Sequence, residues 1–209
     1  MVQEVKQYRI GVLALQGAFA EHINLLKHLP DVAEVVEVRT AQQLEDPSLD
    51  GLIIPGGEST TMALVAEASG VFEPLRKFVQ TKPTWGTCAG LILLAKEASK
   101  TKKGGQKLLG ALDVSVNRNN FGTQIDSFIA NLTIPCVGEK PFACFFIRAP
   151  VITYINTETV EPLVQLDDGT IVAVRQGHLV GTSFHPELTA DDRFHRYFLQ
   201  VVRECQANV

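Results

Sequence analysis

The sequence predicts an α/β protein built on a doubly wound, mixed sheet. Strand-like and helix-like segments alternate through the first half, whereas strand-like segments follow one another without helices in the second half. Repeated strand-to-helix units imply a parallel sheet with right-handed crossovers. In the second half, Asp168-Gly169 separates two apolar runs, which is typical of a hairpin, so we expect the later strands to add an antiparallel extension.

Short apolar runs mark the strands of the first half, and apolar residues at helical spacing mark its helices. A nearly continuous apolar run over 9–15 is typical of a parallel strand covered on both faces. We expect further strands at 35–38, 51–55 and 83–87, with helices at 18–29, 59–68, 72–79 and 89–96.

The second half contains strands of a different arrangement and a closing amphipathic helix. The expected strands are 112–116, 128–134, 142–147, 163–166, 170–175 and 179–184, and the helix is 191–205. The sequence shows no internal repeat, low-complexity tract or linker, so we expect one domain over residues 1–209.

Composition argues against several classes of function. The chain of 209 residues has a net charge of −4, which gives no electrostatic attraction to nucleic acid or anionic lipid. Residues 1–9 lack the apolar core of a signal peptide, and no apolar run is long enough to cross a bilayer. The four cysteines are scattered and form no CxxC pair, so we expect reduced thiols, no metal site and a cytoplasmic location.

One segment carries a candidate nucleophile. Gly86-Thr87-Cys88-Ala89-Gly90 lies between an expected strand and an expected helix. A G-x-nucleophile-x-G turn lifts one side chain above the sheet edge, and the field of the following helix favours the thiolate form of cysteine. Taken alone, the motif is equally compatible with a buried cysteine beside two turn glycines.

A second segment supplies the partners that a cysteine nucleophile needs. Ser183-Phe184-His185-Pro186-Glu187 follows the last expected core strand, so it should emerge at the carboxyl edge of the sheet, where ligands collect. There His185 can accept the thiol proton, and Glu187 can hold the imidazole in the required tautomer.

The other four histidines are weaker candidates for the base. For His22 and His28, in the first helix, the default expectation is surface or partner contact, and His195, beside two arginines, is expected to be solvated. His178 lies in a turn entering the final strand, at its opposite end. His185 is therefore the favoured base.

Longer motifs give a resemblance that covers nearly the whole chain. They are Leu15-Gln16-Gly17, PGGESTTM (55–62), GTCAGLILLA (86–95), NRNNFG (117–122), FIRAP (146–150) and SFHPELT (183–189). Together they resemble the glutaminase subunits of pyridoxal phosphate synthases, which belong to the class I, triad-type glutamine amidotransferases. GxCxG and HPE are shared by all class I glutaminases, whereas PGGESTTM, TCAGLILLA and FIRAP are more specific. The resemblance implies a flavodoxin-like fold.

The resemblance also implies roles for individual residues. It makes Cys88 the nucleophile, His185 the general base and acid, and Glu187 the residue that orients it. Backbone N–H groups of Gly57 and Ala89 would form the oxyanion hole. Substrate contacts would fall on Gly57, Glu58, Ser59, Arg118, Ile147 and Arg148. For the two arginines a surface ion pair is the alternative. Gln16 is either coupled to a partner or bound to local backbone groups.

The implied reaction is hydrolysis of L-glutamine to L-glutamate and ammonia, without a metal or bound cofactor. The implied partner is a (β/α)8-barrel synthase subunit, which combines the ammonia with ribose 5-phosphate and glyceraldehyde 3-phosphate. A standalone γ-glutamyl hydrolase or small-molecule amidase, or a non-enzymatic regulatory subunit, is the alternative.

Thr123 stands where many relatives carry arginine, and the Lys100–Lys107 stretch is assigned no role.

Overall fold

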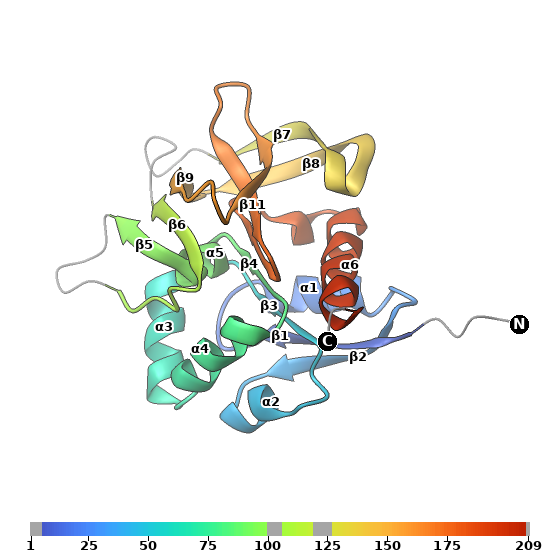
Figure 1. The fold of residues 1–209 in the computed structure, drawn as a ribbon, viewed down its shortest axis with the longest axis vertical. Helices are drawn as coiled ribbons and strands as arrows, with labels where there is room; N and C mark the ends of the chain where they lie inside the picture. Colours follow the sequence, from blue (N-terminus) through green and yellow to red (C-terminus); the bar gives the residue numbers. More distant parts are fainter. Residues whose placement is uncertain (1–5, 100–105, 119–126, 208–209) are drawn as a thin grey trace, which may run out of the picture.

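A mixed seven-stranded sheet forms the centre of the molecule. The computed structural model describes residues 6–99, 106–118 and 127–207. The strand order is β10-β11-β12-β4-β3-β1-β2. The five strands from β12 to β2 pair in parallel, and β11 and β10 continue the sheet in antiparallel pairing. The predicted doubly wound sheet with an antiparallel extension is therefore confirmed (Figure 1).

The strands of this sheet are β1 (Tyr8–Leu13), β2 (Val32–Val38), β3 (Gly51–Ile54), β4 (Thr84–Thr87), β10 (Glu161–Gln165), β11 (Ile171–Gln176) and β12 (Leu179–Thr182). The helices are α1 (Phe19–Leu26), α2 (Ala41–Glu45), α3 (Ser59–Ala68), α4 (Phe72–Thr81), α5 (Ala89–Leu94) and α6 (Arg193–Ala207), with short 3-10 turns η1 (Pro135–Val137) and η2 (Pro186–Leu188).

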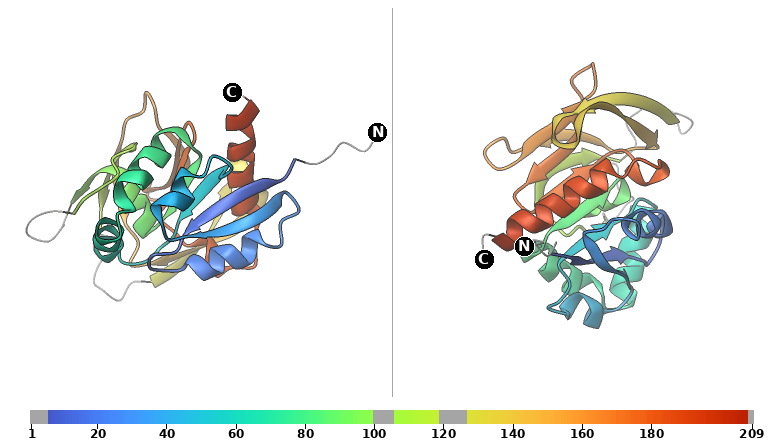
Figure 2. Two further views of the ribbon diagram at one scale, coloured as in Figure 1. Left: turned by 90° about the horizontal axis from the view of Figure 1, so that it is seen from below. Right: turned by 90° about the vertical axis from the view of Figure 1, so that its right-hand side faces the viewer.

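Helices cover both faces of the sheet, which explains why its central strands are apolar on both sides. Helices α2, α3, α4 and α5 contribute to one buried cluster, and α1 and α6 contribute to the other. The two layers can be followed in Figure 2, where α6 crosses one face of the sheet. Trp85 of β4 is fully buried in the second cluster, and its indole N–H donates to Thr182 Oγ1 at 3.2 Å.

Not all of the later strands join the extension as expected, because several strands lie outside the main sheet. β7 (Ser127–Ile134) and β8 (Gly138–Ile147) form a separate antiparallel pair, and β6 (Leu112–Asn117) pairs with β5 (Ala95–Ser99) and β9 (Val151–Ile155). The sequence predicted neither α2, β5 nor β9. The helix expected over 89–96 ends at Leu94, because Ala95 takes an extended backbone conformation and pairs with Leu112.

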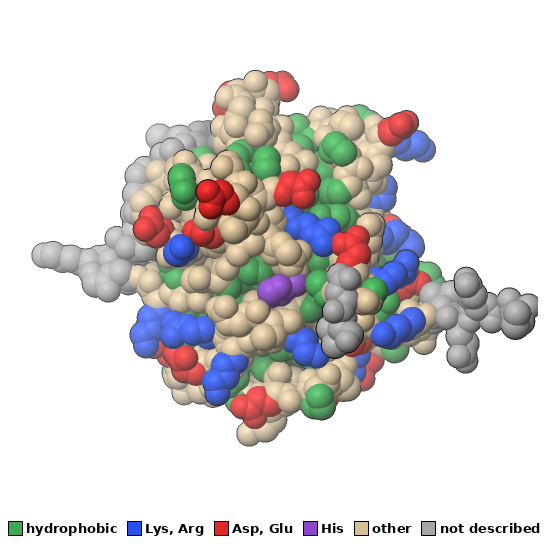
Figure 3. Space-filling model, in the orientation of Figure 1, with side chains coloured by type: hydrophobic (Ala, Val, Ile, Leu, Met, Phe, Trp, Pro, Cys, Tyr) green, Lys and Arg blue, Asp and Glu red, His purple; other side chains and the backbone are tan. Residues whose placement is uncertain are grey.

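The surface carries charges of both signs. On the face drawn in Figure 3, Lys and Arg side chains are interspersed with Asp and Glu side chains. Within the described ranges, no helix is both long enough and apolar enough to span a membrane.

Candidate active site

Four neighbouring parallel strands bring the candidate residues to one edge of the sheet. β12, β4, β3 and β1 lie next to one another and run in the same direction. Their carboxyl ends lead into His185, Cys88, Gly57 and Gln16 respectively. Residues that are far apart in the sequence therefore meet at the edge where the sequence predicted a site.

Cys88 sits on a strained turn between β4 and α5. Its backbone has φ 48° and ψ −100°, a conformation that non-glycine residues rarely adopt. The flanking glycines are needed for packing: a Cβ on Gly86 would lie 2.5 Å from the backbone of Gly90, and one on Gly90 would lie 2.1 Å from the carbonyl oxygen of Ile54. The Cys88 N–H donates to Thr182 O at 2.8 Å, which ties the elbow to β12.

His185 and Glu187 form a buried pair beside the cysteine. His185 Nδ1 lies 2.7 Å from Glu187 Oε1, and the two residues are 8% and 4% exposed. Burial lowers the pKa of His185, but hydrogen bonds and charge from Cys88 and Glu187 outweigh it and raise the pKa to about 10. The backbone N–H of His185 donates to Phe145 O at 2.8 Å, so β8 anchors the segment between β12 and η2 that carries His185.

The turn after β3 packs against both the histidine and the first loop. A Cβ on Gly56 would lie 2.3 Å from His185 Cε1, so only glycine leaves room for the imidazole ring. Gly57 has φ 156°, and a Cβ there would lie 2.4 Å from Gln16 Oε1. That same oxygen accepts a hydrogen bond from the backbone N–H of Glu58 at 2.9 Å. Gln16 therefore binds local backbone, one of the two roles that the sequence left open.

Glu58 and Arg118, both predicted to bind substrate, form an ion pair. Arg118 Nη2 lies 3.0 Å from Glu58 Oε1. Glu58 also caps α3, since its carboxylate accepts from the backbone N–H groups of Thr60 and Thr61 at 3.2 and 2.7 Å. Desolvation opposes the shift, but the hydrogen bonds from Thr61 and Thr60 lower the pKa of Glu58 to about 2. The carboxylate is thus ionised and held at this end of the helix.

The remaining predicted substrate residues lie on α3 and at the end of β8. Ser59 is 2% exposed, and its hydroxyl donates to Gln106 Oε1 at 3.0 Å. Ile147 is 42% exposed, and Arg148 follows it with a positive φ of 46°. Because Phe145 of the same strand binds the His185 backbone, these two residues continue from the strand that anchors the candidate base.

Two histidines lie where the sequence did not place them. His22 and His195 were expected at the surface, yet both are completely buried. His22 lies next to the candidate triad, with its Nε2 at 3.4 Å from Glu187 Oε2. His22 Nδ1 is 2.9 Å from His195 Nε2, and both rings contact the Trp85 ring edge-on. Helical spacing was the signal for their burial, because His22 follows Phe19 by three residues and His195 precedes Phe198 by three.

The other sequence expectations have mixed outcomes. His178 lies at the opposite end of the sheet, as expected, and its Nε2 lies 3.0 Å from Val79 O. His28 is exposed. Thr123 and residues 100–105 lie outside the described residues, whereas Lys107 forms an ion pair with Glu67.

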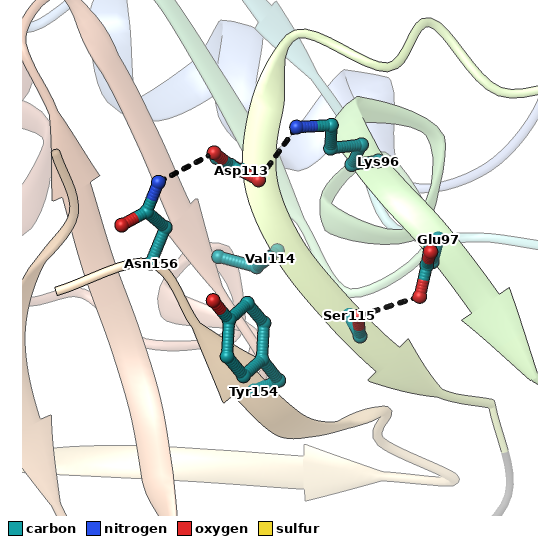
Figure 4. Close-up of a pocket in the computed structure, with 7 residues that line it drawn as sticks. All are labelled: Lys96, Glu97, Asp113, Val114, Ser115, Tyr154 and Asn156. Carbon is teal, nitrogen blue, oxygen red and sulfur yellow. Dashed lines mark hydrogen bonds and ion pairs between the residues drawn. The ribbon is translucent and has the colours of Figure 1, made fainter. Parts of the chain in front are cut away.

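A separate hollow of about 440 Å³ lies between β5, β6 and β9. In Figure 4, Asp113 lies between Lys96 and Asn156, which contact it at 3.0 and 2.9 Å. Glu97 accepts a hydrogen bond from Ser115 at 3.0 Å. Each charged group lining the hollow therefore has a polar partner in it, and none of the predicted site residues lines it.

Comparisons with known proteins agree with this geometry. A crystal structure of a glutamine amidotransferase is 44% identical with a TM-score of 0.81, and the match covers 93% of this chain and 98% of that one. A glutamine amidotransferase from Thermotoga maritima shares the fold at 15% identity and a TM-score of 0.57, with 96% of this chain and 86% of that one covered. The chain therefore has the fold of the class I glutamine amidotransferases.

The family follows from closer relatives. Residues 12–204 match the model of the SNO glutamine amidotransferase family, and the chain belongs to that family of enzymes. A relative in Dehalococcoides mccartyi, named pyridoxal 5'-phosphate synthase subunit PdxT, is 51% identical over 94% of this chain and 98% of its own length. A probable pyridoxal 5'-phosphate synthase subunit PDX2 of Arabidopsis thaliana is 45% identical over 94% of this chain and 87% of its own length. The predicted resemblance is confirmed.

Proposed function

We propose that the chain hydrolyses L-glutamine to L-glutamate and ammonia with a Cys88–His185–Glu187 triad. We further propose that the ammonia passes to a synthase subunit that makes pyridoxal 5'-phosphate. The observation that carries the first part is the His185–Glu187 contact of 2.7 Å beside an elbow cysteine. Hydrogen bonds from the imidazole ring to Cys88 and Glu187 favour the imidazolium form of His185, which suits a thiolate–imidazolium pair. Residues 1–209 would form one glutaminase domain.

In the proposed reaction, the Cys88 thiolate attacks the amide carbon of the glutamine side chain. Backbone N–H groups of Gly57 and Ala89 stabilise the oxyanion of the tetrahedral intermediate. His185 gives its proton to the leaving nitrogen, so ammonia departs and a γ-glutamyl thioester remains. Water then attacks the thioester while His185 accepts its proton, and the thiolate and L-glutamate are released. Glu187 holds the imidazole in position through both steps.

The substrate's free α-amino and α-carboxylate groups need partners of opposite charge. Glu58 and Arg118 provide a carboxylate and a guanidinium 3.0 Å apart at the start of α3, close to Gly57 and Ser59. Ile147 and Arg148 would close the other side of the site from the end of β8. A guanidinium binds a carboxylate through charge-assisted hydrogen bonds, so Arg118 is the proposed ligand of the substrate carboxylate.

The proposed partner is a pyridoxal phosphate synthase subunit, expected from the resemblance to be a (β/α)8 barrel. The names of the relatives in Dehalococcoides mccartyi and Arabidopsis thaliana, each a synthase subunit, support it. Ammonia released into bulk water is protonated and lost, so direct transfer is chemically useful. The proposed compartment is the cytoplasm, where the Cys88 thiol stays reduced.

The test is steady-state release of glutamate by the purified chain, with and without saturating synthase subunit. We expect the synthase to raise the rate strongly and Cys88→Ala to abolish it in both conditions. An isolated chain that is fully active and unaffected by the synthase would instead indicate a standalone amidase. Absence of glutamine hydrolysis in both conditions would reject the proposed function.

A further inference from the structure

The carboxylate of Glu187 has one oxygen that the candidate triad does not use. Oε1 binds His185, whereas Oε2 is completely buried and has no partner at ordinary hydrogen-bond geometry among the described residues. A buried carboxylate is costly unless donors face its oxygens. The polar atom that faces Oε2 is Nε2 of His22, at a distance of 3.4 Å. His22 belongs to α1.

His22 is itself held by a second buried histidine. Its Nδ1 lies 2.9 Å from Nε2 of His195 on α6, and its Nε2 also lies 3.3 Å from the hydroxyl oxygen of Thr87 on β4. Burial, followed by the charges of His195 and His185, lowers the pKa of His22 well below its usual value. Burial likewise lowers the pKa of His195 to about 3. Both rings are therefore neutral at physiological pH, so each carries a single N–H.

Only one tautomer pair satisfies these contacts. If His22 carried its proton on Nδ1, its Nε2 lone pair would face the Glu187 carboxylate, and His195 would need its proton on Nδ1. That atom is buried and has no partner in the described part of the chain, so a donor would be left unsatisfied. With the proton on Nε2 of each ring, His195 donates to His22 Nδ1, and the His22 N–H points towards Glu187 Oε2 and Thr87.

We propose that His22 is a positioning residue for the triad: its Nε2–H holds Glu187 in place, and His195 fixes the tautomer of His22. The proposal rests on the proposed glutaminase function. The separation of 3.4 Å is longer than an ordinary hydrogen bond, but catalytic contacts of a free enzyme commonly tighten in the reacting complex. The ordered series is Cys88 at the elbow after β4, His185 just before η2, Glu187 in η2, His22 in α1 and His195 in α6.

Two substitutions of His22 separate positioning from packing. The amide of His22→Gln can place a donor near the position of Nε2 and reach Glu187. The shorter amide of His22→Asn lies near the position of Nδ1 and reaches only His195. Both variants bury a polar amide in the same site, so their losses of stability should be similar. Partners that orient metal-binding side chains typically contribute ~10–100-fold in activity, and we expect a loss of the same order here.

The experiment measures kcat and KM for glutamine in the complex with the synthase subunit, together with melting temperatures. We expect His22→Asn to lose roughly 10–100-fold in kcat with KM nearly unchanged, and His22→Gln to keep most of the activity. In a Glu187→Gln background, His22→Asn should cost little more, because His22 acts through Glu187.

Equal kcat for the two variants, or a His22→Asn loss that persists in full in the Glu187→Gln background, would overturn the proposal. Should His22→Asn fail to fold, His22→Leu takes its place, since it removes the donor without burying an unpaired amide. A wild-type complex without glutaminase activity would reject the proposed function itself, which is a different outcome from active variants.

Discussion

Gln16 and Glu58 are joined by a hydrogen bond, from the backbone N–H of Glu58 to Gln16 Oε1 at 2.9 Å. The loop after β1 is thereby tied to the turn after β3, which carries the proposed oxyanion donor Gly57. A glycine turn can adopt several backbone orientations at little cost, so a fixed contact beside it limits the directions in which its N–H groups point.

Replacement of the Gln16 side chain should therefore weaken catalysis more than the binding of glutamine. In Gln16→Leu the Glu58 N–H loses its acceptor, and we expect kcat to fall by less than the ~10²–10³ that loss of a whole oxyanion donor costs. Steady-state kinetics of the complex measures the effect. The matched control is Gln165→Leu on the edge strand β10, where an exposed glutamine is far from the site in the sheet order. Similar kinetics for both variants would show that the Gln16 contact has no catalytic importance.

An electrophilic glutamine analogue should label Cys88 alone. Burial raises the pKa of Cys136 to about 11 and that of Cys144 to about 12, and it also raises the pKa of Cys205, so these thiols stay protonated near neutral pH. Peptide mass spectrometry after brief labelling identifies the modified residue. Cys144→Ala should retain labelling, and a label on any cysteine other than Cys88 would contradict the assignment.

Stability should fall on both sides of neutral pH, for different reasons. The pKa of His185 is raised to about 10. Its contribution to the free energy of unfolding is therefore complete below the unfolded-state pKa of ~6.5 and is lost as pH rises towards 10. The pKa of His195 is lowered to about 3. Its contribution to the free energy of unfolding is therefore present above the unfolded-state pKa of ~6.5 and is lost as pH falls towards 3.

Melting temperatures from pH 4 to 10 would test both signs. Glu187→Gln removes one cause of the raised His185 pKa, so it should flatten the alkaline limb. His195→Phe removes the buried titrating ring, so it should flatten the acid limb. The prediction is wrong if either substitution affects the opposite limb instead.

The sequence predicted the main sheet and its candidate catalytic edge because both depend on short, local patterns. Apolar runs followed by glycine turns marked β1 and β3, and the Asp168-Gly169 turn marked the β10–β11 hairpin. It failed where burial is continuous. All residues from Ala89 to Ala95 are buried, so nothing in the apolar pattern marks the end of α5 and the start of β5.

Long-range polar contacts were the other source of error. His22 and His195 are 173 positions apart, and each stands between one buried and one exposed neighbour in the sequence, so their mutual contact has no local signal. Helical spacing places both on buried faces, which the expectation of exposure overlooked, and a lone histidine at such a position does not identify its partner. The contact between Gln16 and Glu58 likewise depends on the order of β1 and β3 in the sheet.

Arg118→Met should raise KM for glutamine if the guanidinium binds the substrate carboxylate. A hydrogen bond to a charged group contributes ~1.5–3 kcal/mol, which corresponds to roughly 10–100-fold in KM. Steady-state kinetics of the complex measures it, and Arg118→Lys should recover part of the affinity by keeping the charge. Unchanged kinetics in Arg118→Met would indicate that the 3.0 Å contact with Glu58 is only a surface ion pair.

Two glycines with positive φ allow a matched test of the oxyanion turn. Gly57 has φ 156°, and a Cβ there would lie 2.4 Å from Gln16 Oε1 and 3.0 Å from Gly17 Cα, so the turn must move in Gly57→Ala. Gly70, after α3, has φ 73°, but a Cβ there would meet no atom within 4 Å. Both substitutions strain the backbone, each by ~1–3 kcal/mol for a non-glycine residue in a sparsely populated conformation, whereas only the first displaces a proposed oxyanion donor.

We therefore expect Gly57→Ala to lose ~10²–10³-fold in kcat with the complex still formed, and Gly70→Ala to lower the melting temperature with normal turnover. Kinetics of both variants at saturating synthase, with assembly checked by size-exclusion chromatography, makes the comparison. If Gly57→Ala turned over glutamine as fast as Gly70→Ala, the oxyanion would have to be stabilised without the Gly57 N–H.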